Sequence, residues 1–250
     1  MTRPLAGKTA LVTGGSRGIG AAIVRRLARD GADVAFSYAS SQADADTVLA
    51  DAKAEEVRAV ALRADQAVAA EVEAMVRKAH DTLGGLDIIV NSAGVFITGA
   101  IDDPALDVAA LDRQLAINLR AVAIMVRTAV PLMNDGGSIV SIGTAGAMHH
   151  TPFAGVADYV ATKAAVAAYT RSLARDLGHR RIRANVVQPG PTDTGMVPTD
   201  GHVADMLKAG IALGRYGTPD EVAAAVAFLV GPEAGFITGA TLAVDGGLSA

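Results

Sequence analysis

Short apolar runs alternate along the chain with longer segments in which apolar positions recur every three or four residues. Runs of the first kind predict buried strands, and segments of the second kind predict amphipathic helices. We expect strands over residues 8–12, 33–38, 57–62, 86–90, 138–142, 183–187 and 241–244. We expect helices over residues 17–29, 68–83, 105–116, 119–133, 157–177 and 219–229. One more helix is expected to follow the second strand and to end at about residue 54. Strands separated by helices of this length imply right-handed crossovers and a parallel sheet.

The fold class that follows is α/β, with a single Rossmann-type, doubly wound parallel sheet of about seven strands and helices on both faces. No linker, internal repeat or low-complexity tract interrupts the pattern, so we expect one domain over residues 1–250. Residues 195–214, after the sixth strand, are expected to contain a short helix and to act as a lid. Ligands of such sheets bind at the carboxyl ends of the strands.

Composition narrows the range of functions. Hydrophobic residues make up 51% of the 250 and charged residues 19%, which is typical of a chain with a well-buried core. The net charge is −4 and no basic block is present, so no nucleic-acid partner is indicated. We predict no membrane span and no signal peptide, and hence a cytoplasmic protein. The absence of cysteine excludes disulfides, thiolate zinc sites and thiol nucleophiles, and we expect no metal.

A glycine-rich segment joins the first strand to the first helix, which is the context of a dinucleotide-binding turn. Gly14 can adopt backbone angles closed to other residues, while Gly18 and Gly20 leave room for phosphate and for close packing of helix on strand. The helix N-terminus offers N–H groups to a pyrophosphate, and Ser16 and Ile19 lie within the same turn. The alternative is an ordinary glycine-rich turn.

The second strand ends at Tyr38, where a site that prefers NAD(H) carries an acidic residue for the ribose 2′-hydroxyl. Arg17 and Ser40 are placed to receive a 2′-phosphate instead. We therefore predict NADP(H) as the cofactor, with NAD(H) less favoured. The alternatives are a solvated charge for Arg17 and capping of the next helix for Ser40 and Ser41.

The third and fourth strands end in further candidate cofactor contacts. Asp65, followed by Gln66, could accept a hydrogen bond from the adenine amine, or could instead cap the next helix. Asn91 can fix the end of the fourth strand through its side chain. The small residues Ala93 and Gly94 let the backbone approach the cofactor.

Tyr159 and Lys163 are spaced to lie one turn apart on the same face of the long helix. A tyrosine with a pKa of roughly 10 is a poor acid or base at neutral pH. A nearby ammonium, together with the positive charge of an oxidised nicotinamide, would favour the phenolate. The pair could then couple proton transfer at a carbonyl oxygen to hydride transfer at its carbon.

Taken together, these motifs resemble the short-chain dehydrogenase/reductase (SDR) family, and most closely its 3-oxoacyl-carrier-protein reductase-like branch. The resemblance runs from about Gly7 to Gly247. It is carried by the segments Thr13–Gly20, Asn91–Gly94, Tyr159–Lys163, Pro189–Thr194 and Val244–Gly247 and by Asn118. Ser92 departs from the Asn that the family usually has.

The resemblance implies further roles. Lys163 would bind the ribose, and Asn118, between two predicted helices, would hold a water that connects Lys163 to solvent; its alternative is a local kink or cap. Pro189 and Gly190 would form a turn before Thr192 and Thr194, which would contact the nicotinamide carboxamide.

The hydroxyl that orients the substrate carbonyl should follow the fifth strand. When the Ile142-Gly143 pair is matched to the family's Ile-Gly, the position of the family's serine is Thr144. Thr144 lies 15 residues before Tyr159, a separation slightly longer than is usual in the family. Ser141 is the alternative, although strand alternation turns its side chain toward a sheet face. The family also implies a homotetramer, with interfaces over residues 119–133 and over 219–229 with the last strand.

The leading hypothesis is an oxidoreductase that transfers hydride between NADP(H) and a carbonyl or secondary alcohol, with Tyr159 as acid and base. A nucleotide-binding sensor without turnover is the alternative. Phe96, Ile97, the segment 145–156 and the lid should enclose the small-molecule substrate. Apolar side chains in these segments suggest an apolar or mixed pocket, namely Met148, Phe153, Met196, Met206 and Leu207. We expect His149 and His150 to contact the substrate or to lie on the loop surface.

Overall fold

A computed structural model of the chain describes residues 3–147 and 154–250, and contains a parallel sheet in the order β3-β2-β1-β4-β5-β6-β7. Every neighbouring pair is parallel, which confirms the predicted doubly wound fold. The order reverses between β1 and β4. The strands are β1 (Thr9–Val12), β2 (Asp33–Tyr38), β3 (Ala59–Arg63), β4 (Leu86–Asn91), β5 (Met133–Ile142), β6 (Arg183–Pro189) and β7 (Thr241–Val244).

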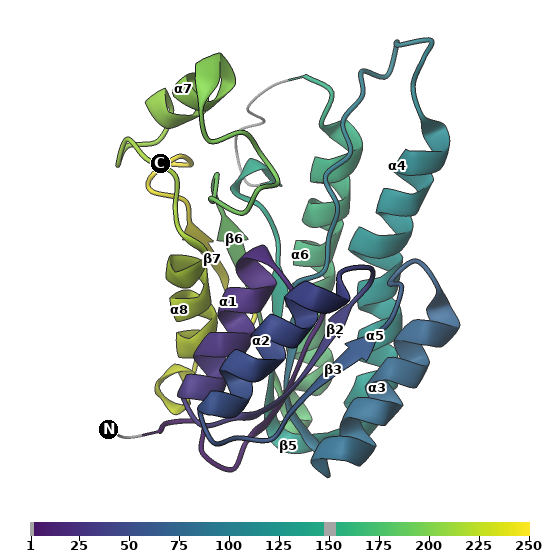
Figure 1. Cartoon of the computed structure of the whole chain (residues 1–250), viewed down its shortest axis with the longest axis vertical. Helices are drawn as coiled ribbons and strands as arrows, with labels where there is room; N and C mark the ends of the chain where they lie inside the picture. Colours follow the sequence, from purple (N-terminus) through teal and green to yellow (C-terminus); the bar gives the residue numbers. More distant parts are fainter. Residues whose placement is uncertain (1–2, 148–153) are drawn as a thin grey trace.

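Helices cover both faces of this sheet (Figure 1). They are α1 (Gly18–Arg29), α2 (Gln42–Ala54), α3 (Ala69–Leu83), α4 (Val108–Leu115), α5 (Ala121–Ala129), α6 (Ala157–Leu177), α7 (Gly201–Ala209) and α8 (Pro219–Val230). One apolar cluster packs α1, α2 and α8 on one face, and a second packs α3, α5 and α6 on the other. Strands drawn from nearly the whole chain share this one sheet, which supports the prediction of a single domain.

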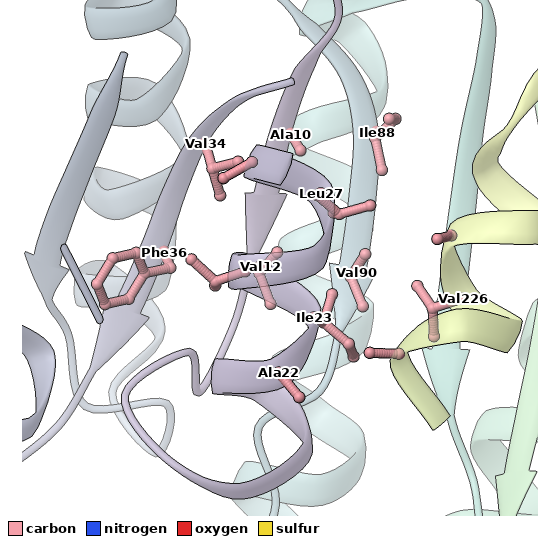
Figure 2. Packing of buried hydrophobic residues seen from close by; sticks show 14 of the residues in the cluster. Ala10, Val12, Ala22, Ile23, Leu27, Val34, Phe36, Ile88, Val90 and Val226 are labelled. Carbon is pink, nitrogen blue, oxygen red and sulfur yellow. The ribbon is translucent and has the colours of Figure 1, made fainter. Parts of the chain in front are cut away.

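The core beneath α1 shows why the first βα unit is rigid. Ile23 and Leu27, four residues apart on α1, are fully buried against β1 and β4 at Val12 and Val90 (Figure 2). Val226 of α8 closes the same cluster from the side. The turn between β1 and α1 therefore has packed elements on both sides.

The sequence predicted two separate helices over residues 105–116 and 119–133. This division is wrong, because a single helix runs through Val108–Leu132. It joins α4 to α5 through a π-turn, Ala116–Arg120. The wider turn keeps Ile117 and Asn118 buried next to each other. By length and composition alone this helix could cross a bilayer, but its Met125 is fully buried in the core cluster that includes α3.

Several strand boundaries also differ from prediction, and the largest difference is at the start of β5. The strand β5 begins at Met133 rather than at residue 138, because Gly136 and Gly137 lie within it instead of stopping it. A Cβ on Gly137 would lie 2.7 Å from the carbonyl oxygen of Asp87, so only glycine fits where the β4–β5 register shifts. β3 begins at Ala59, two residues later than predicted.

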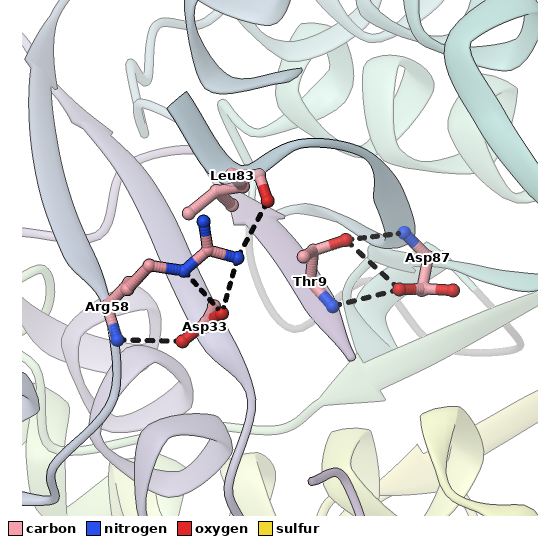
Figure 3. A network of polar contacts seen from close by, with 5 residues as sticks. All are labelled: Thr9, Asp33, Arg58, Leu83 and Asp87. Atoms are coloured by element: carbon pink, nitrogen blue, oxygen red, sulfur yellow. Dashed lines mark hydrogen bonds and ion pairs between the residues drawn. The ribbon is translucent and has the colours of Figure 1, made fainter. Parts of the chain in front are cut away.

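Polar contacts join the amino ends of the strands, opposite the end where ligands bind. The backbone N–H and the hydroxyl of Thr9 donate to Asp87 at 2.9 and 3.0 Å (Figure 3). Arg58 is paired with Asp33 and also donates to the carbonyl oxygen of Leu83. Charged side chains are thus used to fix strand order here, while the carboxyl ends remain open.

Candidate active site

A cavity of about 660 Å³ lies along the carboxyl ends of the strands, where the sheet order reverses. It brings together nearly all the residues predicted for the site. They are Gly14, Ser16, Arg17, Gly18, Ile19, Gly20, Tyr38, Ser40, Asp65, Gln66, Ala93, Gly94, Thr144, Tyr159, Lys163, Pro189, Gly190, Thr192 and Thr194. Asn91 and Asn118 do not line this cavity.

The glycines form a cradle that side chains would fill. Gly14 has φ +67°, and a Cβ there would lie 2.8 Å from the Cα of Ala93. A Cβ on Gly20 would lie 2.1 Å from the carbonyl oxygen of Gly14. No side chain caps α1 and its first turn has no acidic residue, so the N–H groups of the helix start can receive a pyrophosphate.

Thr13 and Ser37, which the sequence analysis did not assign to the site, hold this cradle. The Thr13 hydroxyl accepts hydrogen bonds from the backbone N–H groups of Ser92 and Ala93, both at 3.0 Å. The Ser37 hydroxyl accepts from the N–H of Gly14 at 3.1 Å. The sequence feature that could have identified Thr13 and Ser37 is a polar side chain near the carboxyl end of each strand.

The pocket end near Tyr38 carries groups that fit a 2′-phosphate. The Tyr38 ring is buried, and its hydroxyl donates to the side-chain oxygen of Gln42. Ser41 caps α2 by accepting from the N–H of Asp44, so the capping alternative describes Ser41, and both Ser40 and Ser41 line the cavity. The Arg17 side chain is exposed at the cavity and makes no hydrogen bond or ion pair with any other residue in 3–147 or 154–250.

Asp65 is already engaged, and Val68 rather than Asp65 is the N-cap of α3. The two carboxylate oxygens of Asp65 accept from Arg113 at 3.0 and 2.8 Å, and one of them also accepts from the N–H of Ala67. The Arg113 bond lowers the pKa of the Asp65 carboxyl. An adenine amine at Asp65 would therefore share the carboxylate with Arg113, a cavity residue that no sequence spacing pointed to.

The catalytic candidates meet where α6 approaches the end of β5. Lys163 is buried, and its ammonium donates to the carbonyl oxygen of Ile142 at 2.9 Å. Its Nζ lies 6.0 Å from the centre of the Tyr159 ring. Thr144 is hydrogen-bonded to the Tyr159 hydroxyl. Ser141 is buried on the other side, where it accepts from Asn91 and from Thr170.

Burial governs the ionisation of both groups. It raises the pKa of Tyr159 to about 12, with the Thr144 bond acting in the opposite direction. Burial also lowers the pKa of Lys163 to about 8. In the cofactor-free protein desolvation is therefore the larger effect on the pKa of Tyr159, and stabilisation of the phenolate by the ammonium together with an oxidised nicotinamide stays a prediction.

Asn118 acts on the loop after β4. Its side chain accepts from the N–H of Val95 at 2.9 Å and donates to the carbonyl oxygen of Val95 at 3.0 Å. A Cβ built on Gly94 would lie 3.2 Å from Lys163 Nζ and 3.4 Å from Asn118 Oδ1. Asn118 and Lys163 thus both approach Gly94, which lines the cavity.

The substrate end of the cavity is apolar. The ring of Phe96 meets that of Tyr159 edge to face, with centres 4.8 Å apart. Met196 and Leu207 line the cavity as expected, and so does Leu248, which was missed. Met206 is 55% exposed and does not line it, so its assignment to the pocket is wrong.

Met148, His149, His150 and Phe153 lie outside the described residues. Among residues 3–147 and 154–250, no three His, Asp or Glu side chains gather as a metal site.

A family model described as enoyl-(acyl carrier protein) reductase matches residues 14–249. The cyclic-di-GMP-binding biofilm dispersal mediator protein of Escherichia coli is 45% identical over 98% of each chain. A 3-oxoacyl-[acyl-carrier-protein] reductase of Staphylococcus aureus is 36% identical, over 96% of this chain and 98% of its own.

Among solved structures, a blue fluorescent protein from a metagenomic library, crystallised in complex with NADPH, superposes with a TM-score of 0.95. It is 46% identical, and the match covers 99% of this chain and all of that one. Matches of this length and identity extend across the glycine cradle, the Tyr159–Lys163 helix and the last strand. The chain therefore belongs to the short-chain dehydrogenase/reductase family.

Proposed function

We propose that the protein is an NADP(H)-dependent oxidoreductase that reduces a ketone to a secondary alcohol, or catalyses the reverse reaction. The observation that carries this proposal is the placement of Tyr159, Thr144 and Lys163 in one cavity with a glycine cradle suited to a dinucleotide. Arg17 and Ser40, with no acid at Tyr38, support NADP(H) over NAD(H), in agreement with the cofactor found in the solved relative.

When NADPH is bound, it supplies a hydride to the carbonyl carbon. Thr144 and Tyr159 hydrogen-bond the carbonyl oxygen, and the Tyr159 hydroxyl gives its proton to that oxygen, so the product is a neutral alcohol. Lys163 is held by Ile142 beside the tyrosine, where its ammonium stabilises the phenolate left behind. Asn118 fixes the Val95 backbone next to this group and supports a path for the returning proton.

Replacing Tyr159 with Phe tests this assignment, because it removes one oxygen and keeps the ring that packs on Phe96. We expect kcat for ketone reduction to fall by about 10³-fold or more while the Kd for NADPH changes less than about threefold. Tyr169, which lies further along α6 and does not line the cavity, is the matched control as Tyr169→Phe. Undiminished turnover in the Tyr159→Phe variant would exclude Tyr159 as the proton donor, and no turnover of any ketone by the wild type would remove the reductase proposal.

A second candidate is a nucleotide sensor that uses the cavity without turnover. The relative named for binding cyclic di-GMP favours testing it, and a cradle with Arg17 and Arg113 could accept another phosphate-containing dinucleotide. Calorimetric titration of the protein with cyclic di-GMP, with and without NADPH, distinguishes a sensor from a reductase. Two results together would support the sensor: cyclic di-GMP binds and NADPH abolishes that binding, and the protein oxidises no NADPH with any ketone.

We also propose that the chain works as one domain, in the cytoplasm, as a homotetramer without a nucleic-acid or membrane partner. The apolar side chains of Phe228 and Phe236, exposed near the edge strand β7, support self-association. Residues 195–214 are proposed to close over the substrate, since Met196 and Leu207 line the cavity from that segment.

A further inference from the structure

The wall of the cavity beyond Tyr159 is built from two segments far apart in the sequence. Val197 and Leu207 of the lid pack with Leu248 near the C-terminus, around buried Ala204 and Ile211. Figure 1 shows α7 and the C-terminus side by side at the same end of the molecule. Val197, Leu207 and Leu248 all line the cavity, so one apolar cluster forms this part of its wall.

The position of Leu248 is fixed by a tight turn. The Asp245 carboxylate accepts from the N–H of Gly247 and from the N–H and hydroxyl of Ser249, the last at 2.6 Å. The carbonyl oxygen of Gly246 accepts from the N–H of Leu213, at the end of the lid. The turn therefore holds Leu248 and the lid as a single unit.

Charged groups are scarce at this end of the cavity. Four charged side chains line it among the described residues, namely Arg17, Asp65, Arg113 and Lys163. Asp65 and Arg113 neutralise each other, and Arg17 belongs to the glycine cradle. Lys163 is buried and donates to Ile142, which leaves no cation among the described lining residues to pair with a charged group placed against Leu207 and Leu248.

The outer face of the lid adds no positive field. Its single lysine, Lys208, donates to the carbonyl oxygen of Thr199 at 3.0 Å and lies 5.7 Å from the ring centre of Tyr216. Asp200 and Asp205 bring negative charge to the same segment. An anionic substrate would lose hydration against the leucines without a cation among the described lining residues beside them, an expensive combination.

We propose that the substrate is an uncharged, largely apolar ketone, and that Leu207 and Leu248 are the residues that select it. The inference rests on the proposed function, because it identifies the substrate class of the same site. A ketone carried on an acidic partner or bearing a carboxylate falls outside this class. The two leucines act by desolvation, so a cation introduced at either position should change the selectivity.

The test uses two ketones that share one aryl framework, methyl 4-acetylbenzoate and 4-acetylbenzoate, of which the second carries a carboxylate. With NADPH and the wild-type protein, we expect kcat/KM for the ester to exceed that for the acid by about 100-fold. Leu207→Arg and Leu248→Arg should raise kcat/KM for the acid by about tenfold. Unchanged NADPH binding shows that each variant is folded.

Met206→Arg is the matched control, since Met206 precedes Leu207 on α7 but is exposed and does not line the cavity. It should leave the ratio of ester to acid unchanged. Equal turnover of the two ketones by the wild type, or an equal gain in Met206→Arg and Leu207→Arg, would overturn the proposal.

If neither ketone is reduced, the proposed function fails, and calorimetry on the NADP⁺-loaded protein decides the substrate class separately. Tighter binding of the ester supports the apolar site, and tighter binding of the acid contradicts it.

Discussion

Arg17 is the residue on which the choice of cofactor depends most directly. It lines the cavity, is exposed, and follows a loop whose backbone is fixed by Ser37. A guanidinium in this position can pair with a 2′-phosphate, which NADPH has and NADH lacks. The hydroxyl of Ser40 also lines this end of the cavity, but it carries no charge and cannot replace the ion pair with the 2′-phosphate when Arg17 is lost.

Replacing Arg17 with Ala should therefore raise KM for NADPH by about 10- to 100-fold, the range of a charge-assisted hydrogen bond. KM for NADH should change little, because the lost partner is absent from that cofactor. Steady-state kinetics with both cofactors and one ketone measure the difference. An equal loss with NADH would mean that Arg17 supports the loop rather than the phosphate.

Lys163 links catalysis to stability. Burial lowers the pKa of its ammonium to about 8 from 10.5, so the folded state releases a proton that the unfolded chain keeps. The free energy of unfolding should therefore rise between about pH 8 and pH 10.5, whereas below pH 8 the folded state bears the full cost of the buried charge.

Replacing Lys163 with Met should abolish turnover yet stabilise the fold at pH 7 by about 2–3 kcal/mol. The gain should shrink at pH 9.5, where the native lysine is largely neutral. Denaturant unfolding at the two pH values measures both quantities, with exposed Lys53→Met as the control, expected within about 0.5 kcal/mol at each pH. A gain that is the same at both pH values would contradict a titrating Lys163.

At the scale of elements, the π-turn in the helix Val108–Leu132 places Asn118 against the loop after β4. Replacing Asn118 with Leu keeps the volume but leaves the N–H and carbonyl groups of Val95 without their partner. We expect the free energy of unfolding to fall by about 2–4 kcal/mol and kcat to fall by more than tenfold. Both follow from a displaced backbone beside Phe96 and Lys163.

The control for Asn118→Leu is Asn134→Leu, which removes a hydrogen bond to Asp87 at the far end of the sheet. That variant should lose stability but keep kcat. If Asn118→Leu unfolds at the same denaturant concentration as the wild type and retains its activity, Asn118 does not position the loop.

Periodicity predicted the elements but not how they join. The apolar pattern around Ile117 is continuous, so sequence could not show whether Asn118 separates two helices or lies inside one widened turn. Gly136 and Gly137 are typical strand breakers, yet both lie within β5, and at Gly137 the backbone of β4 approaches too closely for a Cβ. Contacts between strands distant in sequence decide such cases.

The candidate site divides in the same way. Residues borne on local motifs, such as Gly14, Tyr159 and Lys163, were predicted from spacing and line one cavity. Arg113 and Leu248 were not predicted, because they reach the cavity only through the packing of α4 beside α6 and of the C-terminal turn on the lid. Neither position has a local pattern that distinguishes it from an exposed helix or a chain end.

At the scale of the molecule, the sheet leaves β7 as an edge strand, with half-buried residues along its length. Close to it, Phe236 is fully exposed and Phe228 on α8 is 42% exposed. An open strand edge beside exposed aromatic rings is costly in water and is relieved by a second copy of the chain. Val108 and Leu115, on the α4 helix, form a separate apolar surface.

Two such surfaces are what a homotetramer needs, so light scattering at micromolar concentration should give about four times the 25.3 kDa chain mass. Phe236→Glu should open only the contact at β7 and leave a dimer joined through the α4 surface. Val68→Glu changes an exposed apolar side chain at the start of α3 and should leave the tetramer intact. A monomeric wild type would contradict the assembly, and a tetrameric Phe236→Glu would exclude Phe236 from its interface.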